Sequence, residues 1–258
     1  MTRILKIEFL KLIQYKPAWL YLGLFSLVFF LTATLITKIT TLINADAQMF
    51  DLSTIVTIPQ AWKTYSWLAS WFHILLGLFL ILITTNEFVY RTLRQHIIDG
   101  MSRKDVFASK LSIILGLALY PCLLVILFCL FFGKSSPTSH FFDGVEMLFP
   151  LFFKTVNYLG FAMILSLWLK KPTPAIIWYL LYPNFFEPLL GLMAEAYADI
   201  KLTPFLPFQV YGEIIPSPLA QFMESSNVLT TIEVYGLSSF YVLGILIINW
   251  LLIEKSDF

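Results

Sequence analysis

The chain has 258 residues, of which 59% are hydrophobic and only 13% are charged, and its formal net charge is +1. Soluble domains carry about 25% charged residues, and a water-soluble fold of this size could not bury so large an excess of apolar side chains. The near-zero charge gives no indication of nucleic-acid binding. The composition predicts an all-α polytopic membrane protein, because helices satisfy their own backbone hydrogen bonds in a bilayer.

Residues 1–16 are predicted to form an N-terminal interfacial amphipathic helix. Leu5, Phe9, Leu12 and Ile13 share one face, and most other positions are basic or polar. Such a helix lies in the membrane interface with its apolar face down. A plain cytoplasmic extension of the first span is the alternative. The interleaved charges and the lack of a small-residue cleavage site argue against a cleavable signal peptide.

Six apolar segments follow, each near the roughly 20 residues that cross a hydrocarbon core. The predicted spans cover about 19–42, 67–85, 111–132, 147–169, 175–193 and 234–253. The fifth contains Pro183 and Pro188, which would kink or break a helix. Six transmembrane helices are therefore predicted as crossings of a single transmembrane domain, residues 1–258, and the fifth is not expected to be straight.

Basic residues fall mainly in the segments that alternating spans place on one side. That side holds Arg3, Lys6, Lys11, Lys16, Arg91, Arg94, Arg103, Lys104, Lys110, Lys170, Lys171 and Lys255, and the other holds Lys38, Lys63, Lys134 and Lys201. The positive-inside rule then places both termini in the cytoplasm. The segment 194–233 is external in this topology. Because it is rich in proline and apolar residues, we expect short re-entrant helices that dip into the outer membrane face before the last span.

The segment between the second and third predicted spans, residues 87–110, is dense in charge in a chain that is otherwise poor in it. Within it, Leu93, Ile97 and Ile98 lie at i, i+4 and i+5, a spacing that gives a short helix over 91–99 one apolar face. The pattern predicts a short cytoplasmic helix that lies parallel to the membrane.

The residues after this helix predict a sharp reversal. Gly100 can end the helix, because glycine accepts the left-handed conformation that follows a helix C-terminus. Ser102 and Asp105 have the spacing of a capping box, which would start the next helix.

This order of features resembles the permease subunits of bacterial ABC transporters of the ABC-2 type. In that family, a charged segment after the second span ends in a Gly-x-Ser-Arg-like turn and forms the coupling helix that docks on the ATPase. The matching ATPase-coupling positions here are Glu87, Arg91, Arg94, Asp99, Gly100, Ser102, Arg103 and Lys110. The interfacial helix, the six spans and the partly embedded external loop are also what the resemblance implies. A charged loop that only sets membrane topology is the alternative.

The resemblance implies a subunit of the bacterial inner (cytoplasmic) membrane that couples ATP hydrolysis by a separate ATPase to export of a lipid-like, peptide or other amphiphilic substrate. The sequence has no Gly-x-x-x-x-Gly-Lys-Ser/Thr loop. ATP and Mg are therefore expected on the partner, and this chain is expected to bind no cofactor and to be no enzyme. Two ATPase copies and a second permease subunit, identical or similar, are implied as partners.

Two other functions are open at this stage. A membrane anchor or assembly factor could recruit an ATPase for mechanical work without itself transporting a solute. An intramembrane enzyme is less favoured, because no catalytic or metal-binding motif occurs and His73, His96 and His140 fall in three different segments.

Polar residues inside spans are functional candidates. Lys154 and Asn157 lie three residues apart in the fourth predicted span, and Glu187 lies between the two prolines of the fifth. We expect these three as candidate pathway residues, and an ion pair between Lys154 and Glu187 is one hypothesis. Snorkelling to the interface is the alternative for Lys154. His73 is expected to be hydrogen-bonded locally rather than to act as a ligand.

Overall fold

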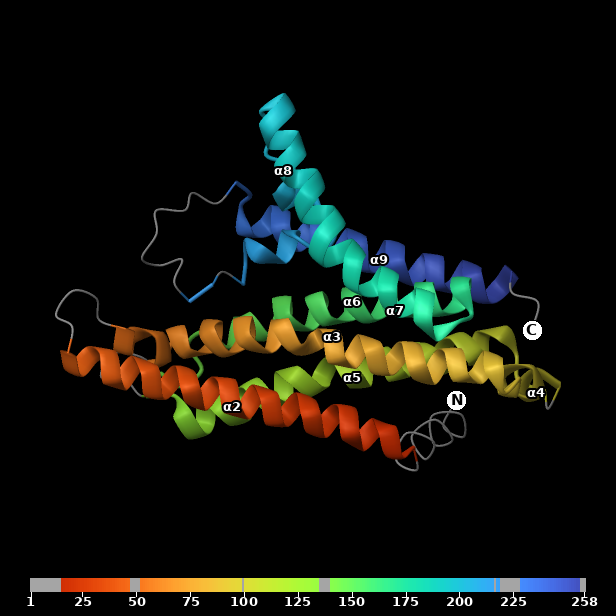
Figure 1. Cartoon of the computed structure of the whole chain (residues 1–258), viewed down its shortest axis with the longest axis horizontal. Coiled ribbons are helices and arrows are strands. Elements are labelled where there is room, and N and C mark those ends of the chain that lie inside the picture. Colours follow the sequence, from red (N-terminus) through yellow and green to blue (C-terminus); the bar gives the residue numbers. More distant parts are fainter. Residues whose placement is uncertain are drawn as a thin grey trace.

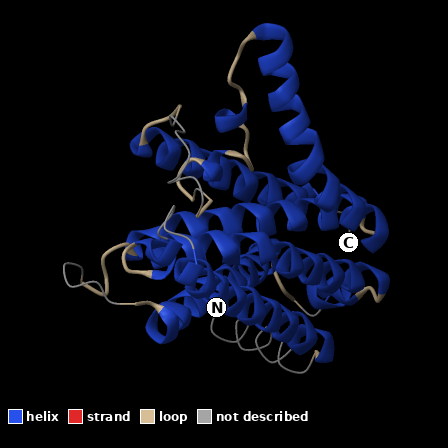
Figure 2. Ribbon diagram, turned by 60° about the vertical axis from the view of Figure 1, so that its left-hand side comes forward, coloured by secondary structure: helices blue, strands red, loops and turns tan. Residues whose placement is uncertain are grey.

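A computed structural model describes residues 15–46, 52–98, 100–134, 140–215, 217–218 and 228–255. The described part is a bundle of helices, which confirms the all-α prediction (Figure 2). The predicted interfacial helix at 1–16 lies outside the described residues except for its last two positions, and Asp99 lies outside them as well.

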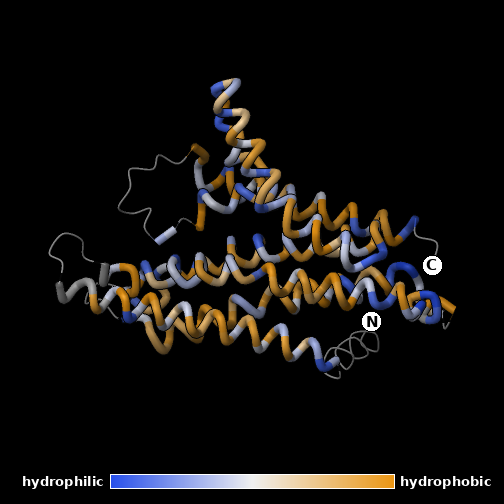
Figure 3. The backbone as a smooth tube through the Cα atoms, viewed as in Figure 1, coloured by the Kyte–Doolittle hydropathy of each residue, from blue (hydrophilic) through white to orange (hydrophobic). Residues whose placement is uncertain are grey.

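In the described part of the chain, five helices are long and apolar enough to cross a membrane. They are α2 (Lys16–Asp46), α3 (Gln60–Val89), α5 (Arg103–Phe132), α6 (Leu148–Leu169) and α9 (Thr231–Lys255). All five run along the long dimension of the bundle (Figure 1). Hydrophobic residues predominate along their middle sections (Figure 3), and many large apolar side chains face outward. These features are compatible with a multi-pass membrane protein.

The short helix α4 (Thr92–Ile98) connects α3 to α5 and defines one end of the bundle, the α4 end. The described chain begins at this end, because Asn86 Nδ2 at the close of α3 donates to Tyr15 Oη over 3.1 Å. It also finishes there, since the rings of Phe107 in α5 and Trp250 in α9 lie 5.3 Å apart. The chain therefore returns to the end from which it starts.

The opposite end, the far end, is where α2 finishes and α3 begins. It contains the short 3₁₀ helices η1 (Leu52–Val56) and η2 (Val145–Met147), and Thr57 and Lys134 form an isolated backbone bridge there. Trp62 is buried at this end and donates its Nε1–H to Phe141 O over 2.9 Å.

One predicted boundary is corrected at this point. Residues 60–66, which precede the predicted second span, form the first turns of α3, because Trp62 and its neighbours pack into the core. α5 begins at Arg103, directly after the predicted capping box, and contains the predicted third span.

The fifth predicted span is divided, as its prolines indicated. α7 (Pro172–Leu181) leads into a π-helical turn, η3 (Tyr182–Phe186), and then into α8 (Glu187–Ala198). Proline removes a backbone donor, and π-turns absorb such interruptions. α7 packs on α3 and α6, whereas α8 leaves the bundle and points away from it in both views (Figures 1 and 2). Six crossings therefore remain a prediction.

Short helical turns after α8 fold back onto the bundle. η4 (Thr203–Phe205) and η5 (Val210–Gly212) flank Phe208, whose side chain is buried against α6. This segment forms a wall beside α6. Its predicted position within the membrane stays a prediction.

Gly77 allows α7 to approach α3 closely, which gives a test of this packing. A Cβ at Gly77 would overlap the buried ring of Tyr179, whereas one at Gly116 in α5 would meet no atom within 4 Å. We expect Gly77→Ala to lower stability by about 1–3 kcal/mol, the usual range for overpacking. Gly116→Ala should be neutral or mildly stabilising. Thermal unfolding of the purified variants in detergent checks both, and equal unfolding midpoints would contradict the packing.

Candidate functional site

The helix α4 is amphipathic and lies at the surface of the α4 end. Leu93 is buried and Ile97 is half-buried against the core, one helical turn apart. Arg94, Gln95 and Ile98 are exposed on the opposite side. The helix is thus anchored by one face and presents a basic and apolar face outward. The predicted apolar face is confirmed for Leu93 and Ile97 and is wrong for Ile98, which is 75% exposed, because position i+5 lies too far around the helix from Leu93 to reach the core.

The turns on both sides of α4 have left-handed backbone. Arg91 precedes the helix with φ of 55°, and Gly100 follows it with φ of 96° and donates its N–H to Ile97 O over 3.0 Å. The predicted capping box is present: Asp105 N–H donates to Ser102 Oγ over 3.2 Å, and Ser102 N–H donates to Asp105 Oδ2 over 3.1 Å. The predicted helix, reversal and helix are confirmed, with α4 spanning Thr92–Ile98.

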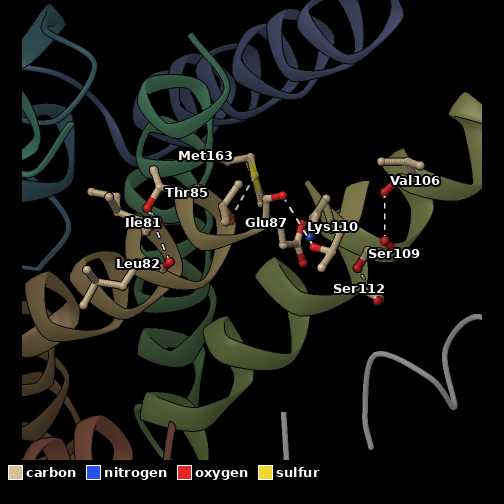
Figure 4. A network of polar contacts seen from close by, with 11 residues as sticks. Ile81, Leu82, Thr85, Glu87, Val106, Ser109, Lys110, Ser112 and Met163 are labelled. Carbon is tan, nitrogen blue, oxygen red and sulfur yellow. Dashed lines mark hydrogen bonds and ion pairs between the residues drawn. The ribbon is translucent and has the colours of Figure 1, made fainter. Parts of the chain in front are cut away.

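Glu87 and Lys110 form a buried ion pair at the base of α4 (Figure 4). Glu87 lies in the last turn of α3 and Lys110 in the second turn of α5, and their side chains are 4% and 3% exposed. Buried charges are tolerated when they are paired. The pair therefore joins the two helix ends between which α4 is held.

Contacts from α6 brace the same region. Thr84 Oγ1 lies 3.7 Å from Met163 Sδ, and the Lys170 ammonium lies 5.7 Å from the centre of the Phe88 ring. The last turn of α3 is thereby held by α5 and by α6, so that α4 sits on a firmly packed base.

The candidate pathway residues lie in the half of the bundle nearer the far end. Lys154 lines a cavity of about 360 Å³ between α3, α6, the π-helical turn and the segment 207–215. Its Nζ donates to Ser70 Oγ over 3.1 Å. Lys154 is half-buried and its ammonium is directed toward α3.

Asn157 and Glu187 converge on one dipeptide in the wall of this cavity. Asn157 Nδ2 donates to Pro207 O over 2.7 Å, and Phe208 N–H donates to Glu187 Oε2 over 3.0 Å. Both polar side chains are fully buried. The hypothesis of a Lys154–Glu187 ion pair is wrong, because each residue has a different partner. The broken helix turns Glu187 toward a backbone N–H that needs an acceptor.

A third hydrogen bond completes this arrangement. Gln209 Nε2 donates to Pro183 O, a carbonyl of the π-helical turn, over 2.7 Å. We call these three hydrogen bonds the wall clamp: Asn157 Nδ2 to Pro207 O, Phe208 N–H to Glu187 Oε2, and Gln209 Nε2 to Pro183 O. The clamp fixes the loop after α8 against both α6 and the broken helix.

Sequence reasoning found some of these residues but not their relations. Glu87 and Lys110 were expected separately as coupling positions, and their pairing was not predicted. Opposite charges at the apolar ends of adjacent spans were the available signal. Ser70 and Gln209 were missed, because a single serine or glutamine in an apolar segment carries no pattern. His73 is hydrogen-bonded locally, as expected, through Nδ1 to Ser70 O.

Among the described residues, no group of three or more His, Cys, Asp and Glu side chains is placed to hold a metal ion. No protein-family model and no curated protein matches this sequence. The functional argument therefore rests on the geometry of α4 and of the cavity.

The buried ion pair predicts a large effect from removing one partner. Lys110→Met should remove the cationic partner of the buried Glu87 carboxylate and cost about 3 kcal/mol or more, which corresponds to about 6–12 °C in the unfolding midpoint. Lys104→Met, which removes an exposed charge from the same helix, is the matched control. The double exchange Glu87→Lys with Lys110→Glu should recover part of the loss. An unfolding midpoint for Lys110→Met equal to that of the control would rule out the pair.

The wall clamp predicts a difference between two substitutions of Glu187. Glu187→Gln keeps an acceptor for Phe208 N–H, whereas Glu187→Leu leaves that group unsatisfied at a cost of about 1–3 kcal/mol. We expect only the leucine variant to lower the unfolding midpoint clearly in detergent. Thr34→Val, which removes an exposed hydroxyl bonded within its own helix, should have no effect. Equal midpoints for the leucine and glutamine variants would show that the carboxylate does not act as this acceptor.

Proposed function

We propose that this chain is the membrane-spanning permease subunit of an ABC transporter of the ABC-2 type. In this proposal a separate ATPase binds α4 and supplies ATP and Mg, and the permease couples hydrolysis to export of a lipid-like, peptide or other amphiphilic substrate. The chain itself is no enzyme. The observation that carries the proposal is α4 itself, a short amphipathic helix with exposed Arg94, Gln95 and Ile98 at one end of an apolar bundle.

The base of α4 supports a role in transmitting motion. A force applied to α4 reaches α3 through the turn at Arg91 and α5 through the turn at Gly100. Because the Glu87–Lys110 pair locks those two helix ends together, a displacement of α4 would move α3 and α5 as a unit. A loop that only sets topology needs no such buried connection.

The distribution of charge supports the proposed sidedness. Basic residues cluster at the α4 end, including Arg103, Lys104 and Lys171, which are exposed there. With this end in the cytoplasm of a bacterial inner membrane, both ends of the described chain face the ATPase. The return of the chain to this end is consistent with an even number of crossings, in which α7 and α8 form the fifth.

An anchor or assembly factor that recruits an ATPase for mechanical work is the second candidate. The exposed α8, which leaves the bundle, is the observation that favours it, because such an arm could hold another membrane component. ATP hydrolysis stimulated by a substrate, together with uptake of that substrate into inverted vesicles, distinguishes a permease from an anchor.

The proposal predicts that the α4 region can be uncoupled without loss of insertion. Gly100→Val places a branched side chain at φ of 96°, where non-glycine residues are strained. A second variant reverses the charges of Arg94 and Asp99. Each of the two variants should reduce co-purification of the ATPase from the native host by about tenfold or more. Membrane extraction and unfolding midpoint should stay near wild type for the charge-reversed variant.

The control for this experiment is Lys201→Glu, which reverses an exposed charge outside the α4 end. Wild-type ATPase recovery in both α4 variants, or the absence of any ATPase with the wild-type chain, would contradict the proposed function.

A further inference from the structure

The cavity near the far end contains polar groups that the helical packing does not satisfy. It lies between α3 and α6 and is closed on the third side by the π-helical turn and the wall clamp. Its volume of about 360 Å³ falls within the usual range for small-molecule sites, about 300–1,000 Å³. The space is large enough for a polar head group and too small for a whole lipid.

Lys154 is the cation of this cavity, and it is incompletely paired. Its ammonium has three N–H donors, and its one hydrogen bond among the described residues goes to Ser70 Oγ. No acidic side chain lines the cavity in the described part of the chain. The carboxylate of Glu187, which does not line the cavity, accepts a hydrogen bond from Phe208 N–H instead. An ammonium in an apolar bundle without a carboxylate is costly unless an anion reaches it.

His73 supplies a second unpartnered group beside Lys154. Its Nδ1 donates to Ser70 O, and because a carbonyl can only accept, that nitrogen carries the proton. Nε2 is therefore left as an acceptor, is buried and has no hydrogen-bond partner among the described residues. The ring is held on Tyr158, with ring centres 3.7 Å apart, so the orientation of Nε2 is fixed. A single ligand that carries an anionic oxygen and a hydroxyl donor would satisfy both groups.

The surroundings of the cavity indicate where such a ligand comes from. Both α3 and α6 begin at the far end. At a rise of about 1.5 Å per residue, Ser70 lies about 15 Å from the first residue of α3, and Lys154 lies about 9 Å from the first residue of α6. Both depths are on the side of the bundle midpoint toward the far end. Trp71 lines the cavity and is 57% exposed on the outside of the bundle. Exposed tryptophan is typical of the level of lipid head groups.

We propose that this cavity binds the acidic head group of a membrane lipid, a phosphodiester that carries a free hydroxyl. Lys154 Nζ holds an anionic phosphate oxygen, His73 Nε2 accepts the head-group hydroxyl, and the acyl chains leave past Trp71 into the bilayer. The proposal concerns binding alone and does not depend on an ATPase.

The test uses the full chain purified in a neutral detergent, with phosphatidylglycerol as the probe and phosphatidylcholine as the neutral comparison. Binding is measured by native mass spectrometry and by the rise in the unfolding midpoint with lipid concentration. We expect phosphatidylglycerol to bind the wild-type chain more tightly than phosphatidylcholine. Lys154→Met should weaken phosphatidylglycerol binding by about tenfold or more, because a charge-assisted hydrogen bond is lost.

Three further variants keep the test informative. Lys154→Arg should retain the preference for phosphatidylglycerol, and His73→Phe should reduce it while leaving phosphatidylcholine binding unchanged. Lys201→Met, which removes an exposed lysine that does not line the cavity, should behave as wild type. If Lys154→Met does not fold, the comparison of His73→Phe with Lys201→Met decides the question.

Equal affinity for the two lipids, or unchanged phosphatidylglycerol binding in both the Lys154 and His73 variants, would overturn the proposal. Soluble glycerol 3-phosphate is the third probe, and its binding is measured in the same way. If it binds the wild-type cavity and phosphatidylglycerol does not, the site belongs to a soluble phosphate ester and the lipid assignment is wrong.

Discussion

Backbone hydrogen bonding in apolar surroundings is the constraint on which this structure depends. A chain in a bilayer has no water to satisfy a free N–H or C=O group, so long uninterrupted helices are the default. The interrupted segment from α7 to α8 follows the same rule by other means. Its π-helical turn exposes Pro183 O, and Gln209 supplies the donor. In the loop after α8, Asn157 donates to Pro207 O and Glu187 accepts from Phe208 N–H. The break and the loop are therefore one structural unit, and the cavity exists because of both.

Charged side chains within the bundle have two different kinds of partner. At the α4 end, Glu87 and Lys110 neutralise each other, and the result is a fixed connection between α3 and α5. Nearer the far end, Lys154 bonds only the Ser70 hydroxyl among the described residues, and Glu187 accepts from Phe208 N–H. A paired buried charge contributes to a defined geometry, whereas an unpaired one retains the capacity to bind an anion. The two regions thus differ in how a buried charge is balanced, and the mechanical role at one end and the recognition role at the other are our proposals.

Much of the α4 region could be predicted, because its signals are local. The apolar spacing of Leu93 and Ile97, the left-handed Gly100 and the capping box of Ser102 depend only on residues within a few positions of one another. The interrupted fifth segment was predictable for the same reason, since proline acts on its own helix. The cavity was predicted only as three scattered polar residues. Its assembly depends on contacts between residues far apart in the chain, such as Lys154 with Ser70 and Asn157 with Pro207.

The sequence by itself determined the all-helical fold, most of the helices and the turn chemistry, because composition, hydropathy and capping act within single segments. Only the tertiary structure decided which polar groups meet. Lys154 and Glu187 were equally compatible with an ion pair or with separate roles, and the direction in which each side chain points settled the matter. The same holds for Glu87 and Lys110, which are 23 residues apart and become partners only when α3 and α5 pack side by side. The physical reason is that a charge finds its partner by position in space, and that position is set by helix packing rather than by any local pattern.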